Sequence, residues 1–141
     1  MKLLIINGPN LNLTGTREKD IYGNIGFDTI LNKLRDHFSK NRIDYFQSNI
    51  EGEIIDRLQQ ADKNYNGIIL NAGGYTHTSV AIGDAVRALV TPVAEVHLSN
   101  IFNRESYRHV SYISPSARGV ITGFGPEAYR LAVIYFTDKL F

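Results

Sequence analysis

The sequence has no cysteine among its 141 residues, and this absence excludes several kinds of protein. Without cysteine there is no disulfide framework, no thiol nucleophile and no cysteine-based metal site. An excess of one charge is also missing, because 15 Lys and Arg face 14 Asp and Glu, for a formal net charge of +1. This balance gives no indication of a nucleic-acid or membrane partner.

Long apolar runs are absent as well. The N-terminal segment has only four consecutive apolar residues, Leu3 to Ile6, before Asn7. A signal peptide needs a longer apolar core, and a membrane-spanning helix needs about 20 such residues. We therefore expect neither, and we expect the protein to be cytoplasmic.

The composition is that of a chain with a real core. Hydrophobic residues make up 43% of the sequence and charged residues 21%, which is typical of globular domains. The length suits one ordinary domain, and no repeat or linker divides it. We expect a single catalytic domain over residues 1–141.

Short apolar runs alternate with longer segments of helical periodicity. Strands are predicted at 2–7, 43–48, 67–72, 93–98 and 119–124. Helices are predicted at 27–41, 53–65, 79–89 and 126–141. Most of the strands are apolar throughout their centres, as expected when both faces of a sheet are covered. The alternation predicts an α/β, flavodoxin-like fold, with a five-stranded parallel doubly wound sheet of order 2-1-3-4-5 and helices on both faces.

Three chemically rich segments each follow a predicted strand. They span 7–23, 71–79 and 97–109 and are dense in Asn, His, Ser, Arg and Tyr. Because open parallel sheets bind ligands at the carboxyl ends of their strands, we expect a site there. The first segment is also long for a connection, which usually has about 4–6 residues. The segment after the second strand, 49–53, shows no comparable chemistry.

Glu95 and His97 lie two positions apart on a predicted strand, so their side chains share one face. A carboxylate beside an imidazole fixes its tautomer and favours the imidazolium, which prepares the histidine as a general acid. The alternative is a polar pair that neighbouring backbone groups satisfy. A metal site is not indicated, because one His and one Glu without H-E-x-x-H spacing are an incomplete ligand set.

The segment "NAGGYTHTS" joins a glycine turn to the start of a helix. Its glycine pair, 73–74, permits close approach of the backbone to a ligand. Candidate helix caps are Thr76, Thr78 and Ser79. His77 and Asp84 share one face if the helix runs through both. Dinucleotide and triphosphate binding are disfavoured, because the segment is neither G-x-G-x-x-G nor a P-loop.

Two arginine patterns remain open at this point. Arg104 and Arg108 are spaced to clamp an anion if the segment is helical, or to form a solvated surface pair. In the first segment, Arg17 near Tyr22 would favour a phenolate, a stronger base than a neutral phenol. The alternative is an ordinary surface loop. Ser99 beside His97 lacks a G-x-S-x-G elbow, so covalent acyl chemistry is disfavoured.

Four motifs together resemble the type II 3-dehydroquinate dehydratases: "NGPNLNLTGTRE…YG", "NAGGYTHTSVAI.DA", "EVHLSNI..RE..RH.SYIS" and "ARGVITGFG". The resemblance covers nearly the whole chain. It implies a flavodoxin-like fold, no cofactor or metal, and dodecamers built from trimers. The implied reaction is loss of water from 3-dehydroquinate to give 3-dehydroshikimate through an enolate, in the shikimate pathway of aromatic amino acid biosynthesis or in quinate breakdown.

The resemblance also implies the catalytic roles of five residues. Tyr22 matches the base that removes the C2 proton, and Arg17 matches the arginine that activates it. Asn10 matches the asparagine that holds a water stabilising the enolate. His97 matches the acid that protonates the departing C1 hydroxyl, and Glu95 orients it. A lid over 17–22 then closes on the substrate, and we expect residues 13–22 to be poorly ordered without ligand.

The substrate-binding residues follow from the same resemblance. Ring hydroxyls are expected at Asn71, His77 and Arg108, the substrate carboxylate at Leu98 and Ser99, and a contact from a neighbouring subunit at Asp84. Gly83 departs from the family pattern, where many relatives carry Arg. The competing interpretations are a flavodoxin-like FMN-binding or signalling domain, which would need a Ser/Thr-rich phosphate loop, and an inactive structural oligomer, which would lack the Tyr and His.

Overall fold

The computed structural model of the chain describes residues 1–16, 20 and 24–138. Within these residues, five parallel strands form one sheet of order β2-β1-β3-β4-β5. The strands are β1 (Lys2–Asn7), β2 (Arg42–Gln47), β3 (Gly67–Asn71), β4 (Val93–His97) and β5 (Gly119–Thr122). The predicted strands and their order are confirmed, with ends that differ by one or two residues.

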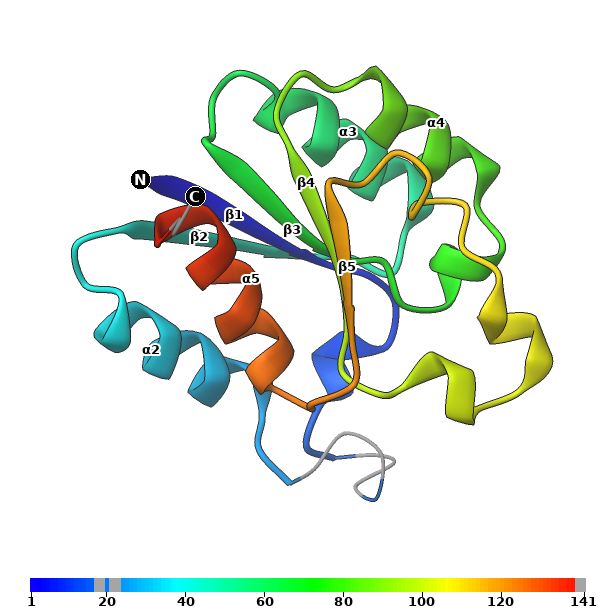
Figure 1. Cartoon of the computed structure of the whole chain (residues 1–141), viewed down its shortest axis with the longest axis horizontal. Helices are drawn as coiled ribbons and strands as arrows, with labels where there is room; N and C mark the ends of the chain where they lie inside the picture. Colours follow the sequence, from blue (N-terminus) through cyan, green and yellow to red (C-terminus); the bar gives the residue numbers. More distant parts are fainter. Residues whose placement is uncertain (17–19, 21–23, 139–141) are drawn as a thin grey trace.

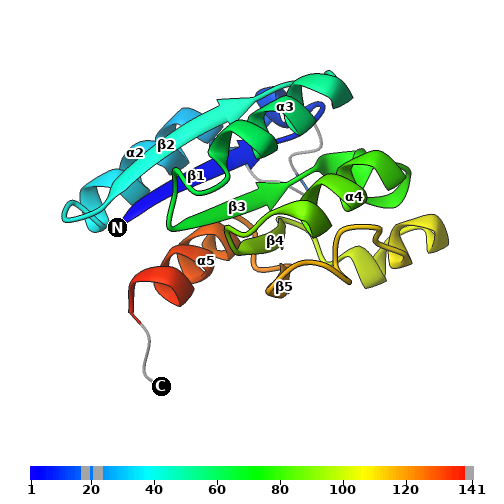
Figure 2. The same cartoon turned by 90° about the horizontal axis from the view of Figure 1, so that it is seen from above.

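Helices cover both faces of this sheet, as Figure 1 shows. They are α2 (Phe27–His37), α3 (Glu51–Ala61), α4 (Val80–Ala88) and α5 (Glu127–Thr137). Helices α2 and α5 lie on one face and α3 and α4 on the other, and Figure 2 shows the resulting three layers from above. In the described part of the chain, no helix is long and apolar enough to cross a membrane. The predicted doubly wound arrangement is confirmed.

Alternate residues of the central strands face the two helical layers, because successive strand side chains point to opposite faces. Leu3 and Ile5 of β1 pack in the core under α2 and α5, together with Phe27 and Tyr129. The alternate residues of β1, Leu4 and Ile6, pack in the second core under α3 and α4. Strands β1 and β3 are therefore apolar throughout their centres, as the sequence predicted.

The carboxyl ends of β1 and β3 are held together closely. The Gly8 N–H donates to the carbonyl of Asn71 at 2.7 Å, which extends the pairing of the strands by one residue. A Cβ at position 8 would overlap the carbonyl of Ala72, so only glycine permits this approach. The two strand ends thus form one continuous floor.

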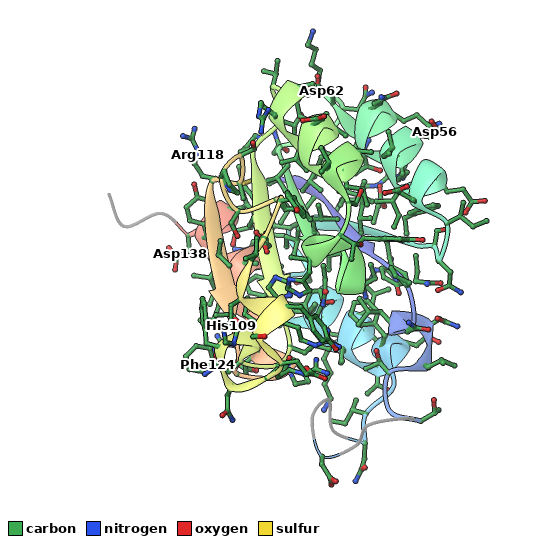
Figure 3. All side chains as sticks on the ribbon, turned by 90° about the vertical axis from the view of Figure 1, so that its right-hand side faces the viewer. Asp56, Asp62, His109, Arg118, Phe124 and Asp138 are labelled. Atoms are coloured by element: carbon green, nitrogen blue, oxygen red, sulfur yellow. The ribbon has the colours of Figure 1, made fainter. Side chains whose placement is uncertain are left out.

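Short 3₁₀ turns, not long helices, surround that floor. They are η1 (Leu11–Leu13), η2 (Gly73–His77), η3 (Ile101–Asn103) and η4 (Ser106–His109). In Figure 3 the labelled Phe124 and His109 lie at this end of the molecule, whereas Arg118 and Asp62 lie at the opposite end. The polar segments predicted to carry the site are therefore gathered at the carboxyl edge.

Candidate active site

A cleft opens above the carboxyl ends of β1, β3 and β4. It encloses about 720 Å³ of space, including its open mouth. The predicted site residues that line it are Asn10, Asn71, His77, His97, Leu98, Ser99 and Arg108. The structure therefore brings together side chains from three separate segments, as the fold predicted.

The buried pair Glu95 and His97 forms one wall of the site. His97 Nε2 lies 2.7 Å from Glu95 Oε1, and both side chains come from the same face of β4. Glu95 is fully buried, whereas His97 reaches the cleft. Because Nε2 bonds the carboxylate, Nδ1 is the ring nitrogen that remains for a ligand.

Two serines hold the other lone pairs of the Glu95 carboxylate. Ser111 Oγ donates to Oε1 at 3.0 Å, and Ser114 Oγ donates to Oε2 at 2.5 Å. Burial opposes the charged form of Glu95, but the hydrogen bonds from His97, Ser114 and Ser111 outweigh it and lower the pKa of this carboxyl. Glu95 is therefore an anion at neutral pH and accepts the hydrogen bond from His97 Nε2.

His77 stands beside His97 with its ring nearly parallel. The ring centroids are 6.1 Å apart, and His77 Nδ1 lies 2.7 Å from the Val110 carbonyl oxygen, to which it donates. Burial lowers the pKa of His77; the Val110 carbonyl opposes this shift, while His97 and Arg108 add to it. A neutral His77 whose Nδ1 carries the proton leaves Nε2 as a hydrogen-bond acceptor.

Asn10 begins the first loop in an unusual backbone conformation. Its φ is 68°, in the left-handed region, and its N–H donates to Asn49 Oδ1 at 3.0 Å. Gln47 Nε2 donates to the same Asn49 oxygen at 3.1 Å. The segment after β2, for which the sequence indicated no chemistry, therefore braces the start of the cleft loop.

Two arginines enter the cleft from the segment after β4. Arg104 Nη1 donates to Ser99 Oγ at 3.4 Å, and Arg108 Nε donates to Glu105 Oε2 at 2.8 Å. A single helix through both was one of the predicted arrangements, and it is wrong, because η3 ends at Asn103 and η4 begins at Ser106. Both side chains nevertheless line the cleft.

Asp84 is the one described site residue that lies apart from the cleft. It belongs to α4, its side chain is 62% exposed, and Arg87 Nη1 lies 3.5 Å from its Oδ1. The condition for His77 and Asp84 to share a helix face is not met, because His77 ends η2 and α4 begins at Val80 with Ser79 as its cap. Of the three candidate caps, Ser79 is the one that accepts a bond from the helix, at Ile82 N–H.

The remaining predictions for the first loop lie outside the described residues. Arg17 and Tyr22 are not described, and neither are most residues of the proposed lid. Half of the residues 13–22, which we expect to be poorly ordered without ligand, also lie outside the described residues. Among the described residues, no three His, Cys, Asp or Glu side chains gather as a possible metal site.

Several residues of the site were missed by sequence reasoning. Ser111 and Ser114 were quoted in the "SYIS" motif without a role, and Asn49 was passed over. No local pattern links them to Glu95 or Asn10, because the partners lie far along the chain. The available signal was that a buried carboxylate requires donors, and serines are frequent in the segment that returns to β5.

The chain is similar to known proteins of one family. The model of the family "Dehydroquinase class II" matches residues 1–137. A 3-dehydroquinate dehydratase of Clostridium botulinum (strain Loch Maree) is 51% identical over 140 residues, covering 98% of this chain and 95% of its own. That of Fusobacterium nucleatum is 51% identical over 143 residues, covering 98% and 97%. The crystal structure of a type II dehydroquinase from Butyrivibrio crossotus superposes with a TM-score of 0.94 at 42% identity, covering 98% of each chain.

Proposed function

The chain belongs to the class II dehydroquinase family, and from this premise we propose that it removes water from 3-dehydroquinate to give 3-dehydroshikimate. The observation that carries the proposal within the molecule is His97, which reaches the cleft while its Nε2 bonds the buried Glu95. A flavin-binding or signalling domain is not favoured by these likenesses.

His97 serves as the general acid of the reaction. Its Nε2–H bonds the Glu95 carboxylate, so the proton given to the departing C1 hydroxyl comes from Nδ1. After transfer, neutral His97 still donates from Nε2 to Glu95. The carboxylate thus orients the ring before and after the step without itself taking the proton.

Tyr22 serves as the base, and Arg17 activates it from the same loop. The proton removed is α to a ketone, so a base and stabilisation of the enolate suffice, and no Schiff base is required. Asn10 holds a water on the enolate oxygen. The exposed position of Asn10 beside the cleft is compatible with that role.

The other predicted residues bind the substrate. Asn71, His77 and Arg108 take the ring hydroxyls, and the backbone of Leu98 with the Ser99 hydroxyl takes the carboxylate. Neutral His77 supplies an acceptor, which suits a hydroxyl group. Arg104 lies 3.4 Å from the Ser99 hydroxyl and adds positive charge where the carboxylate is placed.

Asp84 reaches the site of a neighbouring subunit in a trimer, and four trimers form a dodecamer. Its exposure on α4, away from its own cleft, supports a contact of this kind. The enzyme acts as a single catalytic domain in the cytoplasm and needs no cofactor or metal. Sedimentation of the purified protein measures the assembly directly.

One assay tests the function. Addition of 3-dehydroquinate to the purified protein is expected to raise the ultraviolet absorbance, because the product is a conjugated enone. The His97→Ala variant, measured at the same concentration, is the control for a contaminating activity. A flat trace from the wild-type protein at high concentration would contradict the proposal.

A further inference from the structure

A buried chain of polar side chains lies beneath the cleft, under the ends of β1 and β3. Asn7 and Asn71 are register partners on these strands, and Tyr129 of α5 brings its hydroxyl to both. Asn71 Nδ2 donates to the Tyr129 oxygen at 2.9 Å, and that hydroxyl donates to Asn7 Oδ1 at 2.7 Å. Asn7 Nδ2 in turn donates to the Tyr45 hydroxyl at 3.4 Å.

The direction of every hydrogen bond in this series of buried side chains is set by one backbone group. The Gly73 N–H, which can only donate, lies 3.2 Å from Asn71 Oδ1. The Asn71 amide therefore turns its nitrogen to Tyr129, which accepts and must pass its own proton on to Asn7. A reversed Asn71 amide would place two donors against each other at Gly73.

The same arrangement determines what Asn71 offers to a ligand. One amide hydrogen is used by Tyr129, and Oδ1 is used by Gly73. Asn71 also lines the cleft, so its second amide hydrogen is left for a bound molecule. We propose that Tyr129 is a positioning residue of the active site: the Gly73 N–H sets which way the Asn71 amide faces, and the Tyr129 hydroxyl holds its nitrogen in place as a donor to a substrate oxygen.

The hydroxyl of Tyr129 is separable from the packing of its ring. The ring is fully buried and meets Phe27 edge to face at 5.1 Å, contacts that a phenylalanine would keep. Burial raises the pKa of this phenol above its ordinary value, so the hydroxyl remains a donor across the working pH range. Tyr129→Phe therefore removes the link between α5 and Asn71 with little change in shape.

The proposal rests on the proposed function, and two readouts separate them. Tyr129→Phe is expected to raise the KM for 3-dehydroquinate about 3- to 10-fold, the loss of roughly one hydrogen bond, with kcat changed less than about threefold. The crystal structure of the ligand-free variant is expected to show the Asn71 side chain displaced, with Oδ1 still facing the Gly73 N–H, because the Tyr129 hydroxyl no longer holds its nitrogen. If the wild-type protein has no turnover, the proposed function fails, and the crystal structure still decides the role of Tyr129.

Tyr65→Phe is the matched control. Its hydroxyl also bridges two side chains, donating to Asp44 Oδ2 at 2.8 Å and accepting from Arg57 Nη2 at 3.0 Å, but these lie outside the cleft. Its KM is expected to equal that of the wild type. For Tyr129→Phe, a KM within about twofold of wild type or an unmoved Asn71 amide overturns the proposal.

Asn7→Leu keeps the proposal testable if Tyr129→Phe does not fold. Leucine branches at Cγ as asparagine does, and its presence removes the acceptor that fixes the direction of the Tyr129 hydroxyl. The KM is then expected to rise about 2- to 5-fold, less than for Tyr129→Phe, because Asn71 can still donate to the phenol. An unchanged KM in this variant counts against the proposal in the same way.

Discussion

The hydroxyl of Ser114 lies 2.5 Å from Oε2 of Glu95, although 19 positions separate the two residues. Glu95 lies on β4 beneath the cleft, and Ser114 belongs to the irregular segment that leads back to β5. The charge beside His97 is thus maintained by a part of the chain that does not line the cleft. This dependence can be tested through pH.

Ser114→Ala is expected to raise the pKa of Glu95, because one of the hydrogen bonds that lower it is lost. A carboxyl whose folded pKa lies below its unfolded value contributes stability at higher pH, and that contribution disappears as the pH falls through the folded pKa. In the variant this loss begins at a higher pH. Urea unfolding between about pH 3 and 7 measures the shift.

Ser116→Ala is the control for this prediction, since the Glu95 partners in the described structure are His97, Ser111 and Ser114. Its stability profile is expected to follow that of the wild type. Identical acid profiles for Ser114→Ala and Ser116→Ala would show that Ser114 does not hold the charge.

Gly83→Ala is expected to destabilise the protein, although alanine is the better helix former. The gain in helix propensity is about 1 kcal/mol. A Cβ at position 83 would overlap the carbonyl oxygen of Tyr112, a backbone atom next to Ser111. Overpacking costs about 1–3 kcal/mol, so we expect a net loss and a displaced serine segment with lower turnover.

The matched control is Gly52→Ala, where α3 leaves open space around an added Cβ. It is expected to stabilise the protein by up to about 1 kcal/mol. Thermal unfolding and turnover of both variants distinguish the two effects. A Gly83→Ala protein as stable and active as the wild type would show that the backbone at Tyr112 can move to accommodate the added Cβ without loss of stability.

Thr76→Val is expected to stabilise the fold. Among the residues that the structure describes, the buried Oγ1 of Thr76 has no hydrogen-bond partner. A buried hydroxyl without a partner costs about 1–3 kcal/mol, and valine replaces it with a methyl group of similar size. The midpoint of denaturant unfolding is the measurement.

Thr14→Val provides the comparison, because the buried Thr14 hydroxyl donates to the Leu11 carbonyl at 2.7 Å. That variant is expected to lose stability by about 1 kcal/mol. Equal losses in the two variants would indicate that the Thr76 hydroxyl is satisfied in solution, by a bound water for example.

Tyr22→Phe is expected to abolish turnover and to leave the fold and assembly unchanged. The substitution removes the group proposed to take the C2 proton, and loss of a general base costs about 10²- to 10⁴-fold. Turnover at saturating 3-dehydroquinate is compared with circular dichroism and sedimentation of the same sample. Near-normal turnover would assign the base to another residue.

Sequence periodicity predicted the sheet because each strand is a local pattern. The short apolar runs that mark the strands and the polar segments after β1, β3 and β4 both consist of residues close together in the chain. The pairing of Glu95 with His97 was predicted for the same reason, since two positions along a strand share a face. These parts of the fold and of the site follow from neighbours in sequence.

The parts that escaped prediction depend on how irregular segments fold back. The sequence left open whether Arg104 and Arg108 share a helix, and the chain forms two separate 3₁₀ turns there. Ser114 and Asn49 meet Glu95 and Asn10 across 19 and 39 positions, and no repeat marks such pairs. Tyr129 was predicted only as one residue of an amphipathic helix. Its neighbours in sequence do not indicate which distant side chains its hydroxyl contacts.

The bond between the Gly8 N–H and the Asn71 carbonyl has a consequence for motion. This amide is buried at the carboxyl end of the central strand β1, so its hydrogen is expected to exchange with solvent only when β1 and β3 separate. Asn10, two residues later, is exposed; its N–H donates to the Asn49 side chain and its carbonyl accepts from the Leu13 N–H. Hydrogen exchange is therefore expected to be faster at Asn10 than at Gly8, because protection passes from strand pairing to a bond with an exposed side chain.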